Sequence, residues 1–458
     1  MNNYIKLPSE LVGFHNQNTE KVYTQSGKEM YLLHGKLKKD SQDYRCPDCN
    51  KKMHIHNEYE VNLKHLSFGD KLSNLRFPKL RYYCPSCKKT KMQSVPFQAP
   101  GHRITKSLYQ YTHDLLAHGF TNKEVAELVG LGKNTVKEID LQRLKKKYTE
   151  DGKKLLKPEM KARFLGIDEF KLHNGHKYAV VIIDMETGHI LWLAHGKKKA
   201  TVYSFIEHVG LEWMDNVEAV ACDMNSDFQE AFEECCPHIQ PVFDFFHIVK
   251  NFNDKVVSEI RKDEQRRLYE EGDFKGAISL KKSRYILTSS RKTLQRKDEE
   301  SKEGKVISKG STLFNKEERR RKSGYVDKYD ELLNQNKLLF TLDFIKEKLN
   351  EAYKLRDEVK MACEISEIMD LCKDTGNKHL RWFKRLLDNH FEGIIAHATY
   401  DISAGKIEGI NNKIKTIRRK GYGYADDDYF FLKLFDASRK GYVRNPTPPK
   451  ISKIPQTL

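Results

Sequence analysis

The period of the apolar and polar positions changes along the chain, and these changes divide it. Between about residues 160 and 248, apolar runs of strand length are separated by turn signals such as His173-Asn-Gly-His176. These runs are residues 163–171, 178–184, 189–194, 217–223 and 240–244. Tight turns join the first three runs, and helices such as Thr201 to Val209 separate the others. The pattern predicts three antiparallel strands followed by alternating helices and strands, which is a mixed α/β sheet.

Helical periodicity governs most of the remaining chain. The expected parts are a cysteine-bearing domain with short strands (1–100), a three-helix domain (101–150), the first part of the sheet core (160–248), a highly charged helical insertion (249–398), the last part of the core (399–440) and a flexible Pro-rich tail (441–458). A chain of 458 residues is too long for one compact core, so a multidomain α/β protein is expected.

Two Cys-x-x-Cys pairs lie in the first part, Cys46-Pro-Asp-Cys49 and Cys84-Pro-Ser-Cys87. Four thiolates with no open position describe a structural Zn²⁺ site, and the rival interpretation, a redox dithiol, needs only one such pair. The other five cysteines show no framework spacing, which fits a reducing cytoplasm. The first part is therefore expected to be a zinc-binding domain.

The three-helix domain carries the features of a helix-turn-helix. Thr121 and Glu124 form a capping box before a short helix, and Gly130-Leu-Gly132 makes the turn. The basic helix from Lys133 to Lys147 follows. Its groove-facing start would present Lys133, Asn134, Thr135 and Lys137 to DNA. The alternative is an ordinary helical hairpin packed in a core.

The chain is strongly basic, with 82 Lys and Arg residues against 64 Asp and Glu residues and a net charge of +18. Such a charge favours a polyanionic partner without specifying a sequence. Half of the surplus lies between Lys281 and Lys322, where 15 basic residues face 6 acidic ones, and we expect this segment to follow a DNA backbone. Apolar runs are too short to span a membrane, and no secretory signal is visible, so a cytoplasmic location without membrane contact is expected.

Three acids in the core are candidates for metal ligands. Asp168 interrupts an apolar strand on the face opposite Glu169, Asp223 ends another strand, and Glu408 lies on a helix. That helix should bury Ile407, Ile410, Ile414 and Ile417. An adjacent stripe runs through Glu408, Asn412, Lys415 and Arg419, and Arg418 is a further candidate for DNA contact. The strand order is that of the ribonuclease H-like fold, in which three such carboxylates would hold two Mg²⁺ ions, with Mn²⁺ able to substitute.

The chain resembles the ISL-three family of bacterial insertion-sequence transposases over nearly its whole length. The matching motifs are Gly166-Ile-Asp168-Glu, Cys222-Asp223, Asp244-Phe-Phe-His247-Ile-Val-Lys250, Glu408-Gly, Asn411-Asn-Lys-Ile-Lys and Gly421-Tyr-Gly-Tyr. The resemblance implies a DDE transposase that binds double-stranded DNA at the ends of its element and in its target, acts as a homodimer and associates with the nucleoid. Asp244, His247 and Lys250 become further candidates for the site. Family members commonly have Asn after the Ser or Thr of the last motif, whereas this chain has Ala404.

Two other functions compete with this interpretation. A transposase-derived protein that binds DNA site-specifically without cutting it would keep the zinc and helix-turn-helix domains, and Ala404 favours it. A ribonuclease or Holliday-junction nuclease could use the same fold, but it would rarely need separate DNA-reading domains. Arg381 and Trp382 in the insertion are candidates for contacting or stacking on a displaced base.

Overall fold

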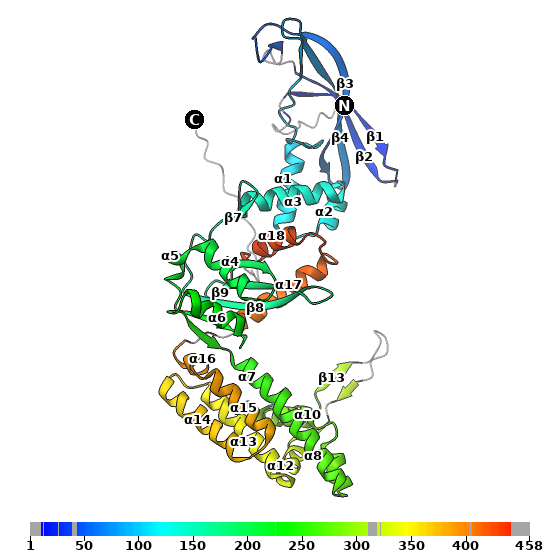
Figure 1. The fold of residues 1–458 in the computed structure, drawn as a ribbon. Coiled ribbons are helices and arrows are strands. Elements are labelled where there is room, and N and C mark those ends of the chain that lie inside the picture. The colour runs from blue at the N-terminus through cyan, green and yellow to red at the C-terminus, as the bar shows by residue number, and fades with distance from the viewer. Residues whose placement is uncertain are drawn as a thin grey trace, which may run out of the picture. The chain divides into compact units, whose positions relative to one another are not determined.

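The computed structural model describes residues 11, 13–25, 27–38, 44–224, 226–309, 318–320, 322–400, 402 and 405–440. The chain divides into two compact units (Figure 1). The first comprises residues 1–156 and 417–437, and the second comprises residues 157–416 and 438–458. The predicted tail, residues 441–458, lies outside the described residues.

The first unit begins with a sheet in the order β1-β2-β4-β3, with β5 added beside β4. Its strands are β1 (Phe14–Tyr23), β2 (Glu29–Leu37), β3 (His54–Phe68), β4 (Lys71–Cys84) and β5 (Lys89–Met92). β3 and β4 are long antiparallel neighbours, whereas β2 and β4 run parallel. Apolar side chains such as Leu63, Leu75 and Phe77 meet on one face of this sheet and form a small core. A separate apolar cluster surrounds Cys46 and Cys84, so the cysteine end of the domain packs independently.

Helices α1 (Lys106–Ala117), α2 (Asn122–Val129) and α3 (Lys133–Tyr148) follow, and β6 (Thr149–Glu150) and β7 (Lys154–Leu155) form a short hairpin. The predicted capping box is present, because Thr121 accepts from the Glu124 amide while the Glu124 carboxylate accepts from the Thr121 amide. Gly130 ends α2 with φ of 67°, a left-handed conformation that favours glycine. Local capping signals therefore set the bounds of α2 where the sequence predicted them.

Helix α18 (Asp427–Ser438) packs against α3 through a buried network of charges. Arg143 donates to Asp140 at 2.9 Å and to Asp436 at 3.1 Å. Lys433 donates to the second oxygen of Asp140 at 2.8 Å. Residues 417–437 thus belong to the same compact unit as the three helices, whereas the sequence analysis assigned residues 399–440 together to the core. This grouping depends on contacts between residues that lie nearly 300 positions apart in the sequence.

The second unit contains a five-stranded sheet in the order β10-β9-β8-β11-β12. Its elements are β8 (Phe164–His173), β9 (Lys177–Asp184), β10 (Ile190–His195), α4 (Lys199–Val209), α5 (Leu211–Met214), β11 (Ala219–Cys222), α6 (Ser226–Cys235) and β12 (Gln240–Phe243). β8, β9 and β10 are antiparallel, as predicted, and β11 runs parallel to both β8 and β12. Continuous apolar runs such as 179–183 are fully buried in this sheet.

The helical insertion leaves the sheet after β12 (Figure 1). Its elements are α7 (Phe245–Asn251), the π-helical η3 (Phe252–Val257), α8 (Ser258–Glu270), α9 (Phe274–Leu280), α10 (Arg284–Thr288), α11 (Arg291–Lys302), β13 (Val306–Lys309), β14 (Glu318–Arg320), α12 (Tyr325–Gln335), α13 (Lys337–Ala352), α14 (Glu358–Asp374), α15 (Lys378–Asn389), α16 (Phe391–Ile395) and the 3-10 turn η4 (Ala396–Ala398). Its apolar residues join those of the sheet in one continuous core. Helix α17 (Gly405–Lys420) then returns to the sheet.

Candidate active site

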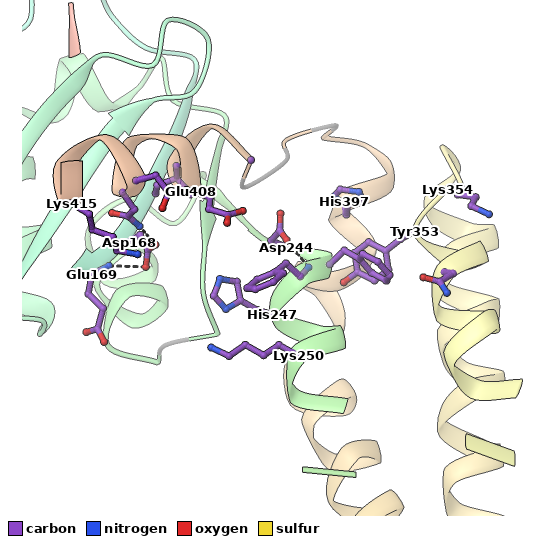
Figure 2. Close-up of a pocket in the computed structure, with 17 residues that line it drawn as sticks. Asp168, Glu169, Asp244, His247, Lys250, Tyr353, Lys354, His397, Glu408 and Lys415 are labelled. Atoms are coloured by element: carbon purple, nitrogen blue, oxygen red, sulfur yellow. Dashed lines mark hydrogen bonds between the residues drawn. The ribbon is translucent and has the colours of Figure 1, made fainter. Parts of the chain in front are cut away.

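A cavity of about 790 Å³ lies where the sheet, the start of the insertion and α17 meet in the second unit. The described residues that line it include Asp168, Glu169, Asp244, His247, Lys250, Tyr353, His397, Glu408, Asn411, Asn412 and Lys415. Figure 2 shows Asp168 and Glu408 beside each other, with His247 and Lys250 directed from α7 toward them. Segments separated by more than 200 residues thus contribute to one site.

Asp168 is a partly buried carboxylate on β8. It accepts hydrogen bonds from the Glu169 amide at 2.7 Å and from Asn411 Nδ2 at 2.5 Å. Burial raises the pKa of Asp168, and the nearby Asp223 carboxylate adds to the rise, while the two hydrogen bonds and His247 act in the opposite direction. A carboxylate in this setting gains from a nearby cation.

Asp223 follows β11 immediately and is level with Asp168 on the neighbouring strand. The parallel register pairs Gly166 with Ala221, and each acid lies two residues beyond that pair. Side chains two residues apart point to the same face, so both carboxylates belong to one face of the sheet. Asp223 Oδ1 lies 3.3 Å from His247 Nδ1, and it also accepts from the Met224 amide at 2.7 Å. His247 therefore orients Asp223 from the side of α7.

Glu169 also lines the cavity, although strand alternation predicts the opposite face. β11 pairs with β8 only from Phe164 to Gly166, so no hydrogen-bonded strand of the described sheet lies beside Glu169 on that edge. One carboxylate oxygen of Glu169 is buried and has no hydrogen-bond partner within the part of the chain that the structure describes.

Close packing against β8 positions the helix that carries Glu408. A Cβ atom at Gly166 would collide with Met185 Sδ at 2.5 Å, and it would lie in van der Waals contact with Ile407 Cδ1 of α17 at 3.4 Å. Lys406 Nζ donates to the carbonyls of Met185 at 2.6 Å and Glu186 at 2.7 Å. These contacts hold the first turn of α17, and Glu408 with it, at the cavity.

Sequence reasoning missed several residues of this site, among them Tyr353, His397 and Asn411, and Asn411 is the one that contacts a candidate ligand directly. The structure buries Ile407, Asn411 and Ile414, whereas the predicted Ile410 and Ile417 are only half-buried. Asn411 is 9% exposed, and its Oδ1 is buried without a hydrogen-bond partner among the described residues. The buried face is rotated because Asp168 supplies a polar partner for Asn411 that helical periodicity cannot reveal.

The predicted stripe on α17 is only partly at the cavity. Glu408, Asn412 and Lys415 line it, while Arg418 and Arg419 lie in the segment that groups with the first unit. Asp244 lines the cavity and caps α7 by accepting from the Phe246 amide at 2.6 Å. Ser403 and Ala404 lie outside the described residues, so the departure at Ala404 has no structural account.

Arg381 and Trp382 do not line this cavity, and they also do not share one with each other. Trp382 lines a hollow with Asp254, Lys255, Glu259 and His379, and it packs against the core. Arg381 lines a different, basic cavity. The two neighbouring side chains thus face different surroundings on α15.

The four cysteines of the first unit come together. Among the described residues, Cys46, Cys49, Cys84 and Cys87 are the one group of three or more His, Cys, Asp or Glu residues whose ligand atoms all lie within 4.8 Å of one another. Backbone amides of Cys49 and Asp48 lower the pKa of the Cys46 thiol to about 7. Four soft donors at this spacing fit a tetrahedral Zn²⁺ ion. The carboxylate oxygens of Asp168, Asp223 and Glu408 do not all lie within 4.8 Å of one another, so these three acids do not form such a group.

At the start of α3, Lys133 and Asn134 are exposed and Thr135 is half-buried. Lys137 instead donates to Asp426 at 2.8 Å, and its ammonium lies 5.3 Å from the centre of the Tyr429 ring. Of the four residues on α3 that were predicted to contact DNA, Lys137 is therefore the one whose side chain already binds another residue of the same unit.

Comparison with known proteins extends these observations. A family model described as a transposase, that of the ISL-three DDE type, matches residues 165–434. The chain belongs to this transposase family. A second model, the zinc-finger of the transposases of IS204, IS1001, IS1096 and IS1165, matches residues 43–87 of this ISL-three member. The two matches contain the three candidate acids and all four clustered cysteines.

Individual relatives of this ISL-three member are also transposases by name. The chain is 26% identical over 433 residues to a protein of Bordetella parapertussis named as the transposase for insertion sequence element IS1001, covering 94% of this chain and 97% of the relative. Proteins of two Mycobacterium tuberculosis strains, named as the transposase for IS1557, are 32% identical over 87 residues, which are 19% of this chain and 20% of theirs. Within the described ranges, no helix has the length and apolar character that crossing a membrane requires.

Proposed function

We propose that this transposase binds the ends of its insertion sequence and catalyses metal-dependent DNA strand cleavage and strand transfer, with Asp168, Asp223 and Glu408 as the metal ligands. The observation that carries the proposal is the register of β8 and β11, which sets Asp168 and Asp223 level on one face of the sheet. Asp168 and Glu408 both line the cavity, and Asp223 lies 3.3 Å from His247, which lines it too. The sheet order, with three antiparallel strands and two parallel additions, supports assignment to the ribonuclease H-like fold.

The donor set fits hard divalent cations. The cavity offers the carboxylates of Asp168 and Glu408 together with the buried Oδ1 of Asn411, which has no hydrogen-bond partner among the described residues. Carboxylate and amide oxygens suit Mg²⁺, and Mn²⁺ is expected to substitute. Three neighbouring carboxylates repel one another unless divalent cations neutralise them, and two-metal sites provide that neutralisation. When bound, two such ions would activate the attacking oxygen and neutralise charge on the leaving oxygen.

The side chains around the cavity prepare it for a phosphodiester. Asn411 and the Glu169 amide fix the orientation of Asp168, and His247 fixes that of Asp223. Lys415 and Lys250 line the cavity as cations and Asn412 as a hydrogen-bond donor, all suited to a phosphate backbone. Water, or a terminal 3′-hydroxyl in the joining step, attacks the phosphorus, and the DNA 3′ oxygen leaves. No side chain needs to act as a nucleophile.

End binding is assigned to the first unit. The exposed Lys133 and Asn134 and the half-buried Thr135 at the start of α3 are proposed to enter the major groove, with the zinc-binding domain beside them on DNA. We propose that a homodimer acts, because two transposon ends must be cut together. The mass of the purified protein–DNA complex in light scattering tests this stoichiometry.

The catalytic proposal is tested with purified full-length protein, DNA carrying the element's own ends, and Mg²⁺ or Mn²⁺. Wild-type protein should nick at the ends, and Asp223→Asn should lose about 10²–10³-fold of the rate while still binding the DNA. Glu233→Gln is the matched control, because this carboxylate on α6 is exposed and accepts a hydrogen bond from Gln229 of the same helix. Cleavage that persists in Asp223→Asn would refute the assignment. Site-specific binding by wild-type protein without any cleavage would favour the non-catalytic alternative.

A further inference from the structure

A second cavity, of about 560 Å³, lies in the helical insertion between the end of α14 and the exposed side of α15. The described residues that line it are Lys373, Lys378, Arg381, Lys384 and Arg385. All are cations, and the lining includes neither a carboxylate nor an aromatic side chain. Five like charges around one hollow repel one another unless anions neutralise them.

The protein neutralises only part of this charge. Lys378 pairs with Asp263 at 3.0 Å and Lys384 pairs with Asp388 at 2.7 Å. Arg381 donates to the Gly376 carbonyl, which carries no net charge. Lys373 and Arg385 have no ion pair within the part of the chain that the structure describes. Three positive charges therefore remain for a ligand from outside.

Basic residues of the segment 281–322, where the sequence placed the surplus of charge, are also paired only in part. Arg284 pairs with Asp254 at 2.5 Å, Arg291 with Asp330 at 2.7 Å and Lys305 with Glu300 at 2.9 Å. Asp254 and Asp330 lie outside the segment, so counting charges along the sequence overstates what it offers to a partner. The cavity on α14 and α15 differs in that its cations surround a single hollow.

We infer that this cavity binds the phosphate backbone of double-stranded DNA. Lys378 and Arg385 are separated by about 10 Å of rise along α15, a length over which one strand of duplex carries about three phosphates. The absence of aromatic and apolar lining in the described residues means that the cavity holds phosphates without reading bases. The identity of the polyanion as DNA rests on the proposed function. The cavity thus gives the insertion a role in holding DNA away from the cleaved bond. This role is separate from the chemistry of the active site.

The test compares two variants of the full-length protein that each remove three positive charges. Lys373→Ala/Arg381→Ala/Arg385→Ala empties the cavity of its unneutralised charge. Arg266→Ala/Lys275→Ala/Lys328→Ala removes the same charge from exposed positions of the insertion outside both the cavity and the 281–322 segment, and serves as the control. Fluorescence anisotropy measures affinity for an end-bearing duplex between 50 and 200 mM salt, and thermal unfolding checks that both variants fold.

The cavity variant should lower the slope of log affinity against log salt by about 2–3, since each lost phosphate contact contributes about 0.9. The control should keep the wild-type slope, and a duplex of unrelated sequence should show the same difference between the variants. An unchanged slope for the cavity variant, or an equal reduction in the control, would overturn the inference. The two proposals fail separately. Cleavage that persists in Asp223→Asn would refute the catalytic assignment without changing the salt slope of the cavity variant. An unchanged slope for the cavity variant would overturn this inference without restoring cleavage to Asp223→Asn.

Discussion

Replacing Arg143 by methionine should destabilise the first unit strongly, because Arg143 holds two buried carboxylates together. Asp140 is fully buried and Asp436 is 3% exposed, and Arg143 donates to both. Methionine keeps most of the apolar stem but leaves both carboxylates short of a cation. Removing one partner from a buried ion pair costs about 3–5 kcal/mol.

The expected cost is at the lower end of that range. Asp140 keeps Lys433 at 2.8 Å, and Asp436 keeps Lys147 at 3.0 Å and the Tyr148 hydroxyl at 2.9 Å. A loss of about 3 kcal/mol lowers the unfolding temperature of a unit of about 150–250 residues by about 6–12 °C. The exposed pair Lys123–Glu127 on α2 supplies the control, because Lys123→Met removes a contact worth at most about 1 kcal/mol.

Differential scanning calorimetry of the full-length protein measures the transition of the first unit. A shift below about 2 °C for Arg143→Met would refute the reasoning, and so would a double-mutant cycle with Asp436→Asn that shows no coupling. The pH dependence gives a second check. Burial tends to raise the pKa of Asp140, but Lys433 and Arg143 lower it overall. Its contribution is therefore complete above its unfolded pKa of about 4 and is lost only as the pH falls further. The difference between variant and wild type should be constant from pH 6 to 8.

Three other substitutions test the sites. Asn411→Leu removes the hydrogen bond to Asp168 and should weaken Mn²⁺ binding by about 10–100-fold, as measured by electron paramagnetic resonance. Asn411→Asp should not restore Mn²⁺ binding, because a second carboxylate would repel Asp168. Cys84→Ser should release Zn²⁺ to a chromogenic chelator and unfold the cysteine cluster, while Cys235→Ser, at an exposed cysteine outside the cluster, should leave both unchanged. Gly166→Val should destabilise the second unit by about 1–3 kcal/mol in thermal unfolding and reduce cleavage, because the valine side chain would collide with Met185 and displace Ile407. Cleavage equal to that of the wild type would contradict the packing argument.

Features set by neighbouring residues could be predicted from the sequence. The bounds of α2 follow from Thr121, Glu124 and Gly130, and the cysteine cluster follows from ligand spacing within each pair. The antiparallel strands of the core follow from their apolar runs and turns.

Features that depend on partners far along the chain could not be predicted. The buried face of α17 includes Asn411 because Asp168 lies opposite, and residues 417–437 join the first unit because Asp436 meets Arg143. The cationic cavity depends on how α14 and α15 pack. The sequence analysis proposed Arg381 and Trp382 together as contacts for a displaced base, but the two side chains line different hollows. Adjacency along a helix does not tell which surface each side chain joins.

Both units are completed by residues that the ribosome adds late. The Asp168–Asn411 hydrogen bond joins positions 243 residues apart, and the Arg143–Asp436 contact joins positions 293 apart. At about 5–20 residues per second, the intervening synthesis takes about 10–60 s. During that time a nascent chain has neither Glu408 at the cavity nor α18 on its three-helix domain. Translation that stops early thus yields a fragment with an incomplete cavity and an N-terminal unit that lacks α18.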